Sequence, residues 1–344
     1  MKIAIHGSNA FAKRWPVSAE KLGCEVMLID GYSPNLFAEI EGCDILLWSL
    51  NHDCSKELKF ARSILRSAQH AGLAVFPDPS TNWHFDDKVA QFYLLSAIDA
   101  PAVKTHVFFS REDSEAFLRT AKFPLVFKLK SGAGSTNVLL VNSRREAHSL
   151  VRRMFGKGIR SFPVIERLRR GATKIRSGGR RRRSIFARAK RGLGLWLKQT
   201  LEAHRERGYV LFQEFLPGND HDLRVTVIGD RAFCFKRGVR KNDFRASGSG
   251  NLVYLSAPEI PADAIALAFE VAQKLSLQAT AFDFLREQET GELRIVELSC
   301  GFLAEAVEAC PGYFTSGGEW VEGNFRPEDL ILEDVLAEIG RKDR

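Results

Sequence analysis

The 344-residue sequence contains no apolar run that approaches the roughly 20 residues of a membrane span. It also has no CxxC pair among its six cysteines and no GxGxxG glycine fingerprint. The first absence excludes a hydrophobic spanning helix, the second disfavours disulfide and zinc scaffolds, and the third removes support for a dinucleotide-binding fingerprint. Residues 1–7 read as a strand and turn and lack the regions of a signal peptide. We therefore expect a cytoplasmic protein, with a peripheral position at a membrane as an option.

Charge is distributed unevenly along the chain. The net charge is +8, but the segment from Arg152 to Arg207 holds 19 basic and three acidic residues. That segment therefore carries +16, which leaves −8 for the rest of the chain. Such a patch usually contacts a phosphorylated molecule, an acidic polymer or an anionic membrane surface. Nucleic acid is not favoured, because the segment lacks the regular aromatic interleaving of a base-stacking platform.

The first 77 residues alternate short apolar runs with helical stretches. Strands are expected at residues 3–5, 26–29, 45–50 and 74–76, with helices near 14–22 and 55–71. This alternation predicts a parallel sheet and an N-terminal α/β domain over residues 1–77. Asn51 and His52 follow the third strand, at the sheet edge where open α/β sheets bind ligands. A structural role is nevertheless the more frequent one for a loop histidine.

The proline-rich residues 77–81 predict a linker to a second domain over residues 78–344. Strands are expected there at 104–109, 125–130, 137–141, 210–215, 223–228, 232–236, 279–285 and 293–298, and helices near 86–95, 111–121, 144–154, 262–275 and 327–339. The predicted fold class is α/β and α+β.

Residues 156–208, here called the basic insertion, interrupt this order. Most connections in compact domains are shorter than about 15 residues, so the insertion is expected to have its own role. Residues 184–201 interleave apolar and basic side chains, a pattern typical of a surface-binding amphipathic helix. A solvated loop explains the insertion equally well.

Two acidic residues bracket a predicted hairpin over residues 279–299. Gly291, third in the loop 289–291, supplies positive φ and gives a register that pairs Asp283 with Glu297. Carboxylates roughly 5 Å apart repel by about 3 kcal/mol, and a divalent cation would turn this repulsion into coordination. The face is expected to contain Ala281, Leu285, Leu293 and Ile295. A solvated sheet face is the alternative.

Other residues are suited to binding anions. Lys128 ends a predicted strand before a small-residue turn whose glycines would let backbone amides approach phosphate oxygens, although an ordinary hairpin turn has the same composition. Arg224 and Arg237 have guanidinium groups that bind phosphate or carboxylate. Arg237 should stand opposite Asp222 on the neighbouring strand, so a structural ion pair is the alternative.

These motifs resemble the ATP-grasp superfamily, and most nearly its RimK-like, glutamate-adding carboxylate–amine ligases. The resemblance covers most of residues 75–340 outside the basic insertion. Five blocks carry it in the family's order: Asp87-Lys88; Lys128 with Ser131, Gly132, Gly134 and Ser135; Gln213, Glu214, Phe215 and Leu216; Asp222-Leu223-Arg224; and Asp283 with Glu297 and Ser299.

The resemblance implies a pre-ATP-grasp domain at residues 1–77 and an ATP-grasp domain with a small lobe at about 100–215 and a large lobe at about 216–344. It implies ATP, with Mg²⁺ or alternatively Mn²⁺, as cofactors. Lys88, Lys128 and the loop from Ser131 to Ser135 would contact ATP, and the strand ending in Gln213, Glu214, Phe215 and Leu216 would bind adenine. Asp222 would bind ribose, and Asp283, Glu297 and Ser299 the metal.

The implied reaction is attack of a carboxylate on the γ-phosphate, followed by capture of the acyl phosphate by an amine. Arg224, Arg237 and Arg245 would stabilise the intermediate. Serine replaces the family's asparagine at Ser299 and at Ser247, which weakens the likeness of the reaction more than that of the fold.

Two other functions remain open from the sequence. One is a kinase that phosphorylates a polyanionic substrate, and the other is a non-catalytic ATP-binding module that docks on an anionic surface. For a ligase, the partners would be a small carboxylate and an amine, and the basic insertion would help to bind an acidic or phosphorylated acceptor.

Overall fold

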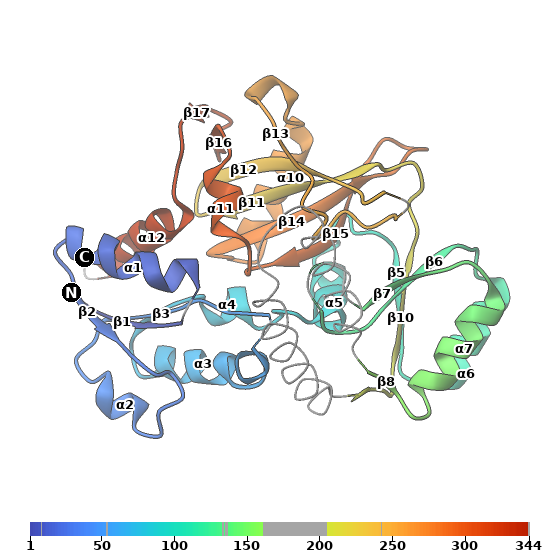
Figure 1. The fold of residues 1–344 in the computed structure, drawn as a ribbon, viewed down its shortest axis with the longest axis horizontal. Coiled ribbons are helices and arrows are strands. Elements are labelled where there is room, and N and C mark those ends of the chain that lie inside the picture. Colours follow the sequence, from blue (N-terminus) through green and yellow to red (C-terminus); the bar gives the residue numbers. More distant parts are fainter. Residues whose placement is uncertain are drawn as a thin grey trace, which may run out of the picture. The chain divides into compact units, whose positions relative to one another are not determined.

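The computed structural model describes the chain except for Ser8, Asp53, Ala133, Ser135, Thr136, residues 161–204, Asn242 and residues 343–344. The described chain forms two compact units (Figure 1). Unit 1 comprises Met1–Ala102 and Leu216–Arg344, and unit 2 comprises Val103–Phe215. The domain boundary expected at residue 77 stays a prediction.

Unit 1 begins with a four-stranded parallel sheet, as predicted. The strands β1 (Lys2–His6), β2 (Glu25–Leu28), β3 (Ile45–Trp48) and β4 (Ala74–Phe76) lie in the order β2-β1-β3-β4.

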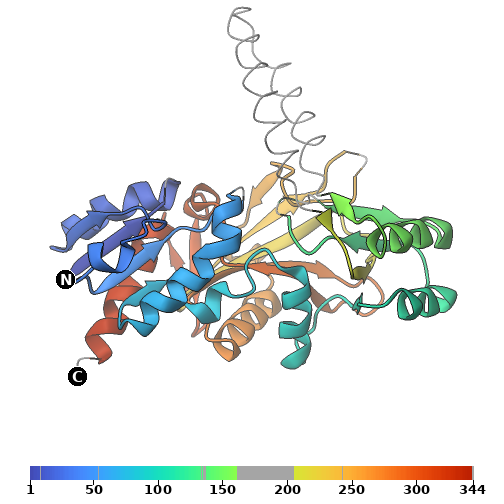
Figure 2. The ribbon, with the colours of Figure 1, turned by 90° about the horizontal axis from the view of Figure 1, so that it is seen from below.

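Helices cover both faces of this sheet because its buried side chains alternate between the faces (Figures 1 and 2). Ile3 and Ile5 pack with helices α1 (Ala10–Lys21) and α12 (Pro327–Lys342). Ala4 and Leu46 pack on the other face with helices α2 (Leu36–Glu39) and α3 (Arg62–His70), which follows a π-helical turn at Glu57–Ala61.

The segment predicted as a linker is instead folded. Residues 79–82 form the short helix α4 (Pro79–Asn82), which Asp78 caps by accepting a hydrogen bond from the Thr81 amide at 2.9 Å. Gln278 binds the same turn, accepting from the Asp78 amide at 2.8 Å and donating its own amide to the Thr81 hydroxyl at 2.9 Å. The prediction was wrong because proline at the first position starts a helix as readily as it marks a loop.

A larger antiparallel sheet completes unit 1. Its strands are β11 (His221–Ile228), β12 (Arg231–Gly238), β13 (Leu252–Tyr254), β14 (Ala279–Arg286), β15 (Leu293–Ser299), β16 (Gly312–Thr315) and β17 (Trp320–Glu322). They lie in the order β15-β14-β11-β12-β16-β17, with β13 also paired to β12. The short strands β13, β16 and β17 were not predicted.

Helices also cover this sheet. Helix α10 (Ala262–Lys274) packs on one face through Ala268 and Phe269. The other face joins the core of α1 and α12 and includes helix α11 (Ala304–Glu308). Helix α5 (Lys88–Ala97) packs beside β15. A 3₁₀ turn at Ala257–Glu259 precedes α10.

Unit 2 is a four-stranded antiparallel sheet with two helices. The strands β5 (Thr105–Phe108), β6 (Leu125–Lys128), β7 (Val138–Val141) and β10 (Val210–Glu214) lie in the order β5-β10-β6-β7. Helices α6 (Arg111–Thr120) and α7 (Arg144–Met154) pack against each other.

The two ends of the basic insertion belong to unit 2. They pair as strands β8 (Ile159–Arg160) and β9 (Arg205–Glu206). The amphipathic helix predicted at residues 184–201 lies outside the described residues.

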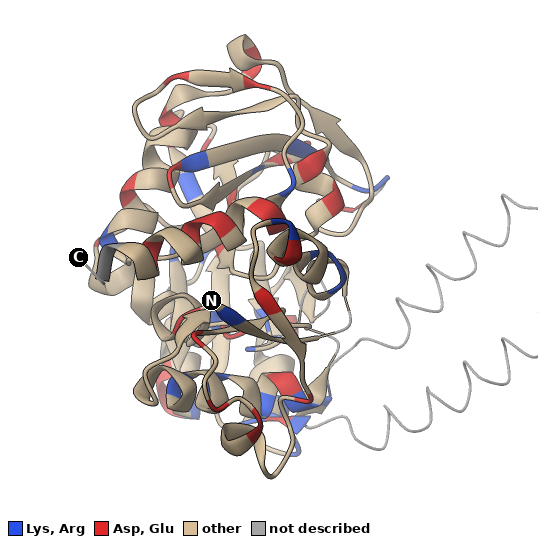
Figure 3. Ribbon diagram, turned by 90° about the vertical axis from the view of Figure 1, so that its left-hand side faces the viewer, with Lys and Arg blue, Asp and Glu red and all other residues tan. Residues whose placement is uncertain are grey.

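Figure 3 shows acidic and basic residues interspersed over the described ribbon. None of the helices described for this chain combines the length and apolarity needed to cross a bilayer.

Candidate active site

The hairpin β14–β15 places Asp283 opposite Glu297, as predicted, but by a different route. Arg286 pairs with Leu293 and not with Arg294, the partner that the predicted register required, and the Glu287 amide donates to the Glu292 carbonyl, so the loop holds the four residues 288–291. The unpaired Val296 forms a bulge in β15, and this bulge restores the predicted register at Asp283. The bulge also reverses the faces of the residues before it. Ile295 pairs with Phe284, so the predicted placement of Leu293 and Ile295 beside the carboxylates was wrong: both belong to the core under α10.

Asp283 is buried between two arginines. Its side chain is 6% exposed, so a solvated sheet face is excluded for this residue. Arg224, directly opposite on β11, donates its Nε to Oδ1 at 2.7 Å. Arg237 on β12 lies 2.6 Å from Oδ2 through Nη2. The carboxylate predicted to bind metal is therefore already engaged by two guanidinium groups in this structure.

Arg237 also forms an ion pair with Asp222, which lies on the paired strand β11. It donates Nε and Nη2 to the two carboxylate oxygens at 2.7 and 2.6 Å, so the predicted cross-strand pair and its ion-pair alternative are both confirmed. Its third nitrogen reaches the Ser247 hydroxyl at 3.5 Å. All three nitrogens of Arg237 thus have partners, and Arg237 joins the two acids into one cluster.

The electrostatics of this cluster favour charge on Asp283. Burial acts to raise the pKa of Asp283, but the charges and hydrogen bonds of Arg224 and Arg237 outweigh burial and lower that pKa to about 2. Burial, together with the negative charge of Asp283, raises the pKa of Asp222 despite its bonds to Arg237. When both carboxylates share Arg237, a proton therefore goes to Asp222 first.

Glu297 and Ser299 occupy the end of β15. Lys88, only 6% exposed at the start of α5, places its ammonium 3.4 Å from Oε1 of Glu297. The Ser299 hydroxyl accepts from the Gly301 amide at 3.1 Å and donates to the Gly301 carbonyl at 3.2 Å. The structure thus brings Lys88 together with Glu297 of the predicted metal pair.

The loop after β12 holds the third predicted catalytic arginine. Arg245 donates Nε and Nη2 to the Asp243 carboxylate at 2.9 and 2.7 Å. Arg240 lies 3.6 Å from the same carboxylate and donates to the Ser247 carbonyl at 2.9 Å. Asp243, which the sequence analysis did not single out, therefore orients the arginines of this loop.

In unit 2 a carboxylate lies on the predicted phosphate-binding turn. Glu206 on β9 accepts from the backbone amides of Lys130 and Ser131 at 2.9 and 3.4 Å, and from the Ser131 hydroxyl at 2.5 Å. Tyr209 donates to Glu206 and accepts from the Lys130 amide at 2.5 Å. Sequence reasoning missed Glu206 because it lies at the end of the basic insertion.

The rest of the turn shows the conformation expected of its glycines. Gly132 and Gly134 have φ of 119° and 62°, and Lys128 at the end of β6 is 6% exposed. Asn137 donates to the Ser131 carbonyl at 2.8 Å. Ser135 lies outside the described residues.

The strand predicted to bind adenine is β10. Gln213 donates to the Thr105 hydroxyl at 3.1 Å, and Glu214 lies 3.2 Å from the ammonium of Lys104. Phe215 ends unit 2, and Leu216 begins the second stretch of unit 1.

The proposed metal ligands are all hard oxygen donors, which suits Mg²⁺ and Mn²⁺. In the described part of the chain, no three His, Cys, Asp or Glu side chains gather closely enough to hold a metal ion. The two carboxylates are moreover balanced by Arg224, Arg237 and Lys88. The donor types therefore fit a metal that arrives together with phosphate oxygens, which would supply the missing negative charge.

The structure resembles solved ATP-grasp proteins over nearly its whole length. A RimK domain ATP-grasp protein from Sphaerobacter thermophilus is 15% identical, with 98% of this chain and 100% of that chain covered and a TM-score of 0.55. D-alanine–D-alanine ligase from Bacillus anthracis is 11% identical, with 99% and 98% covered and a TM-score of 0.58.

N5-carboxyaminoimidazole ribonucleotide synthetase from Thermotoga maritima is 15% identical, with 97% of this chain and 75% of that chain covered and a TM-score of 0.57. No family model and no curated protein sequence matched. The chain has the fold of the ATP-grasp ligases, as its motifs predicted.

Proposed function

We propose that this protein is an ATP- and magnesium-dependent ligase that joins a carboxylate to an amine through an acyl phosphate and releases ADP. The observation that carries the proposal is the buried Asp283, held by Arg224 and Arg237 and paired with Glu297. To these residues the ATP-grasp resemblance assigns the roles of metal-binding acids and of arginines that take part in the reaction. The solved relatives with this fold include ligases that differ in their substrates.

Arg224 is the best candidate to bind the anionic intermediate. It uses Nε for Asp283, and its two terminal nitrogens make no hydrogen bond to any described residue. A guanidinium group fixed at Nε presents its remaining donors in a rigid plane that matches phosphate or carboxylate. Arg245, oriented by Asp243, would add a second positive charge. All three nitrogens of Arg237 already have partners, so we assign Arg237 the role of positioning Asp222 and Asp283.

Asp283, Glu297 and Ser299 would hold the metal. When bound, Mg²⁺ would neutralise the charge that spreads over the oxygens of the transferred phosphoryl group. Lys88 beside Glu297 supplies positive charge from the protein itself. Catalysis in this arrangement is mainly positioning and electrostatic stabilisation, because no protein nucleophile is required.

Unit 2 would contribute the nucleotide contacts. We assign Lys128, Ser131, Gly132, Gly134 and Ser135 to the phosphates. The backbone of β10 at Gln213, Glu214 and Phe215, with Leu216 after it, is assigned to adenine. Asp222 in unit 1 can bind ribose only by sharing oxygens that Arg237 already uses, which carboxylate lone pairs allow.

The proposal is tested by ADP release from purified protein given ATP, Mg²⁺ and pools of amino acids and sugar acids. We expect release that requires both a carboxylate and an amine. Asp283→Asn and Glu297→Gln should reduce it by at least about 100-fold, on the order of losing one major transition-state interaction. Matched controls are Asp263→Asn and Glu292→Gln, whose exposed carboxylates pair with Arg286 and Arg294 away from the cluster.

Other outcomes would support the two remaining functions. Transfer of labelled γ-phosphate to a stable product would indicate a kinase. ATP binding without turnover, unaffected by either substitution, would indicate a binding module. A role of the basic insertion in binding an acidic or phosphorylated acceptor stays a prediction, and steep salt dependence of acceptor binding would support it.

A further inference from the structure

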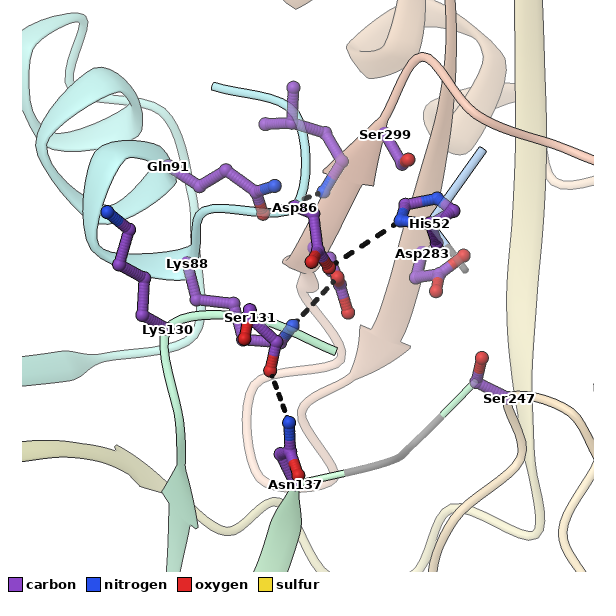
Figure 4. A network of polar contacts seen from close by, with 12 residues as sticks. His52, Asp86, Lys88, Gln91, Lys130, Ser131, Asn137, Ser247, Asp283 and Ser299 are labelled. Carbon is purple, nitrogen blue, oxygen red and sulfur yellow. Dashed lines mark hydrogen bonds and ion pairs between the residues drawn. The ribbon is translucent and has the colours of Figure 1, made fainter. Parts of the chain in front are cut away.

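A histidine and a buried aspartate meet at the edge of the N-terminal sheet. His52 lies beyond β3, at the carboxyl edge of the parallel strands, and Asp86 lies in the turn before α5. Nδ1 of His52 is 3.5 Å from Oδ1 of Asp86, whose side chain is only 4% exposed (Figure 4). Asp86 has φ of 53°, a left-handed conformation that costs free energy outside glycine, so the turn holds this carboxylate in place against strain.

The imidazole is positioned from two further sides. Its ring lies against Phe85, with the centroids 4.2 Å apart. A Cβ placed on Gly301 would come within 2.8 Å of the imidazole Nε2 and of the Phe85 ring, so only glycine permits this approach. Nδ1 of His52 is buried, although the side chain as a whole is 24% exposed. The exposed surface of the ring therefore belongs to its other atoms, among them Nε2.

Two short connections join this pair to the proposed reaction centre. Gly301 exchanges hydrogen bonds with Ser299, at the end of the strand that carries Glu297. Lys88, two residues after Asp86, forms the ion pair with Glu297. Both connections lie within unit 1. His52 is therefore beside the end of β15, to which the proposed function assigns the metal ligands Glu297 and Ser299.

The chemistry of the second half-reaction requires a proton acceptor. An amine that attacks an acyl phosphate must lose a proton, and histidine held by a carboxylate is the side chain most often used for such a transfer near neutral pH. A separation of 3.5 Å is longer than a hydrogen bond, but catalytic hydrogen bonds are often long in structures without substrate. In the part of the chain that the structure describes, Asp86 and, on the turn before α3, Glu57 are the charged groups that interact with His52.

We propose that His52 is the general base of the amine-capture step and that Asp86 is its positioning residue. The inference rests on the proposed function. The amine nitrogen forms a bond to the acyl carbon, the bond from that carbon to the phosphate oxygen breaks, and phosphate leaves with its electron pair. Nε2 of His52 takes the proton released by the amine. Solvent accepts that proton afterwards.

Hydroxylamine separates this step from the one before it. Hydroxylamine is uncharged near neutral pH and captures acyl phosphates without a general base, so the hydroxamate it forms reports on the acyl phosphate alone. Full-length wild type, His52→Gln, Asp86→Asn and the control His70→Gln would be given ATP, Mg²⁺ and the carboxylate pool, with either hydroxylamine or the amine pool. His70 is an exposed histidine on α3, in the same part of unit 1.

We expect His52→Gln to lower amide formation by about 100-fold, the lower end of the usual effect of a general base, and to leave hydroxamate formation within about twofold of wild type. Asp86→Asn should lower amide formation by about tenfold with the same selectivity.

Equal amide rates in His52→Gln and His70→Gln would overturn the inference. So would loss of hydroxamate and amide together in His52→Gln, because that result would mean that the residue supports the fold or the first half-reaction. A wild-type protein that forms neither product would overturn the proposed function itself, and the inference with it. The proposed function survives if wild type forms both products and His52→Gln does as well.

Discussion

The carboxylates of the two units differ in their burial and in their hydrogen-bond partners. In unit 1, Asp283 is buried and held by the guanidinium groups of Arg224 and Arg237. In unit 2, Glu206 is partly exposed and binds the backbone amides of Lys130 and Ser131. A buried charge that loses its partner is costly, whereas backbone amides near solvent exchange one anion for another at little cost. The carboxylate of unit 1 is thus fixed by buried ion pairs, whereas the carboxylate of unit 2 occupies backbone amides that, under the proposed function, a phosphate would use.

The largest effect should come from breaking the unit 1 cluster. Arg237→Met leaves Asp222 and Asp283 buried without the arginine that they share, so unfolding free energy should fall by about 3–5 kcal/mol. Chemical denaturation measures this change. The control is Arg286→Met, whose exposed pair with Asp263 should cost less than about 1 kcal/mol. Equal losses in both variants would contradict the distinction.

The second prediction concerns pH. Because the pKa of Asp283 is lowered to about 2 in the folded protein, its ionised form contributes stability that is fully present above the unfolded pKa near 4 and is lost as pH falls through 2. The stability that the Asp283 carboxylate contributes, measured as the difference between wild type and Asp283→Asn, should therefore shrink by roughly 2 kcal/mol between about pH 5 and pH 2. Denaturation curves at several pH values test this, with Asp263→Asn, at an exposed carboxylate, measured beside it as a control.

A smaller effect is expected in unit 2. Glu206→Gln removes a charge that, under the proposed function, would compete with phosphate for the amides of Lys130 and Ser131. ATP should then bind about threefold to tenfold more tightly, since a charge-assisted hydrogen bond is worth roughly 1.5 kcal/mol. Calorimetric titration measures this affinity. The control is Glu115→Gln, on the surface of α6. If ATP binding becomes weaker in Glu206→Gln and stays unchanged in the control, the Glu206 carboxylate supports the loop and does not compete with phosphate.

The smallest effect should follow from Tyr209→Phe. The Tyr209 hydroxyl accepts from the Lys130 amide and donates to Glu206, so its loss weakens the internal anion without removing it. We expect a change in ATP affinity of no more than about threefold, in the same direction as Glu206→Gln. Little further change should occur when both substitutions are combined, because both act on one hydrogen-bonded group.

Local sequence signals predicted the pairs that depend on one hairpin. Asp222 faces Arg237, and Asp283 faces Glu297, because each pair is joined by a short turn. The pairing of Asp283 with Glu297 was predicted correctly, but the loop length from which it was predicted was wrong. The four-residue loop shifts the register by one residue, the bulge at Val296 shifts it back, and no residue type in the hairpin predicts that bulge.

Contacts between distant segments could not be predicted. Arg224 meets Asp283 because β11 and β14 are neighbours in the sheet although 59 residues separate the two side chains. The position of His52 after β3 indicated a possible ligand-binding residue, but the sequence around Asp86 indicated only the start of a helix and not its contact with His52. Turn and helix signals describe neighbours along the chain, whereas strand order follows from packing of the whole sheet.

The central claim, that a carboxylate is activated as an acyl phosphate, is tested most directly by isotope transfer. Wild-type protein would be given ATP, Mg²⁺, the amine pool and carboxylates labelled with ¹⁸O, and the released phosphate analysed by mass spectrometry. Reaction through an acyl phosphate would give one labelled oxygen in each phosphate formed, because the carboxylate oxygen stays with phosphorus when the amide forms. Release of ADP with unlabelled phosphate, or label retained wholly in the product, would contradict it.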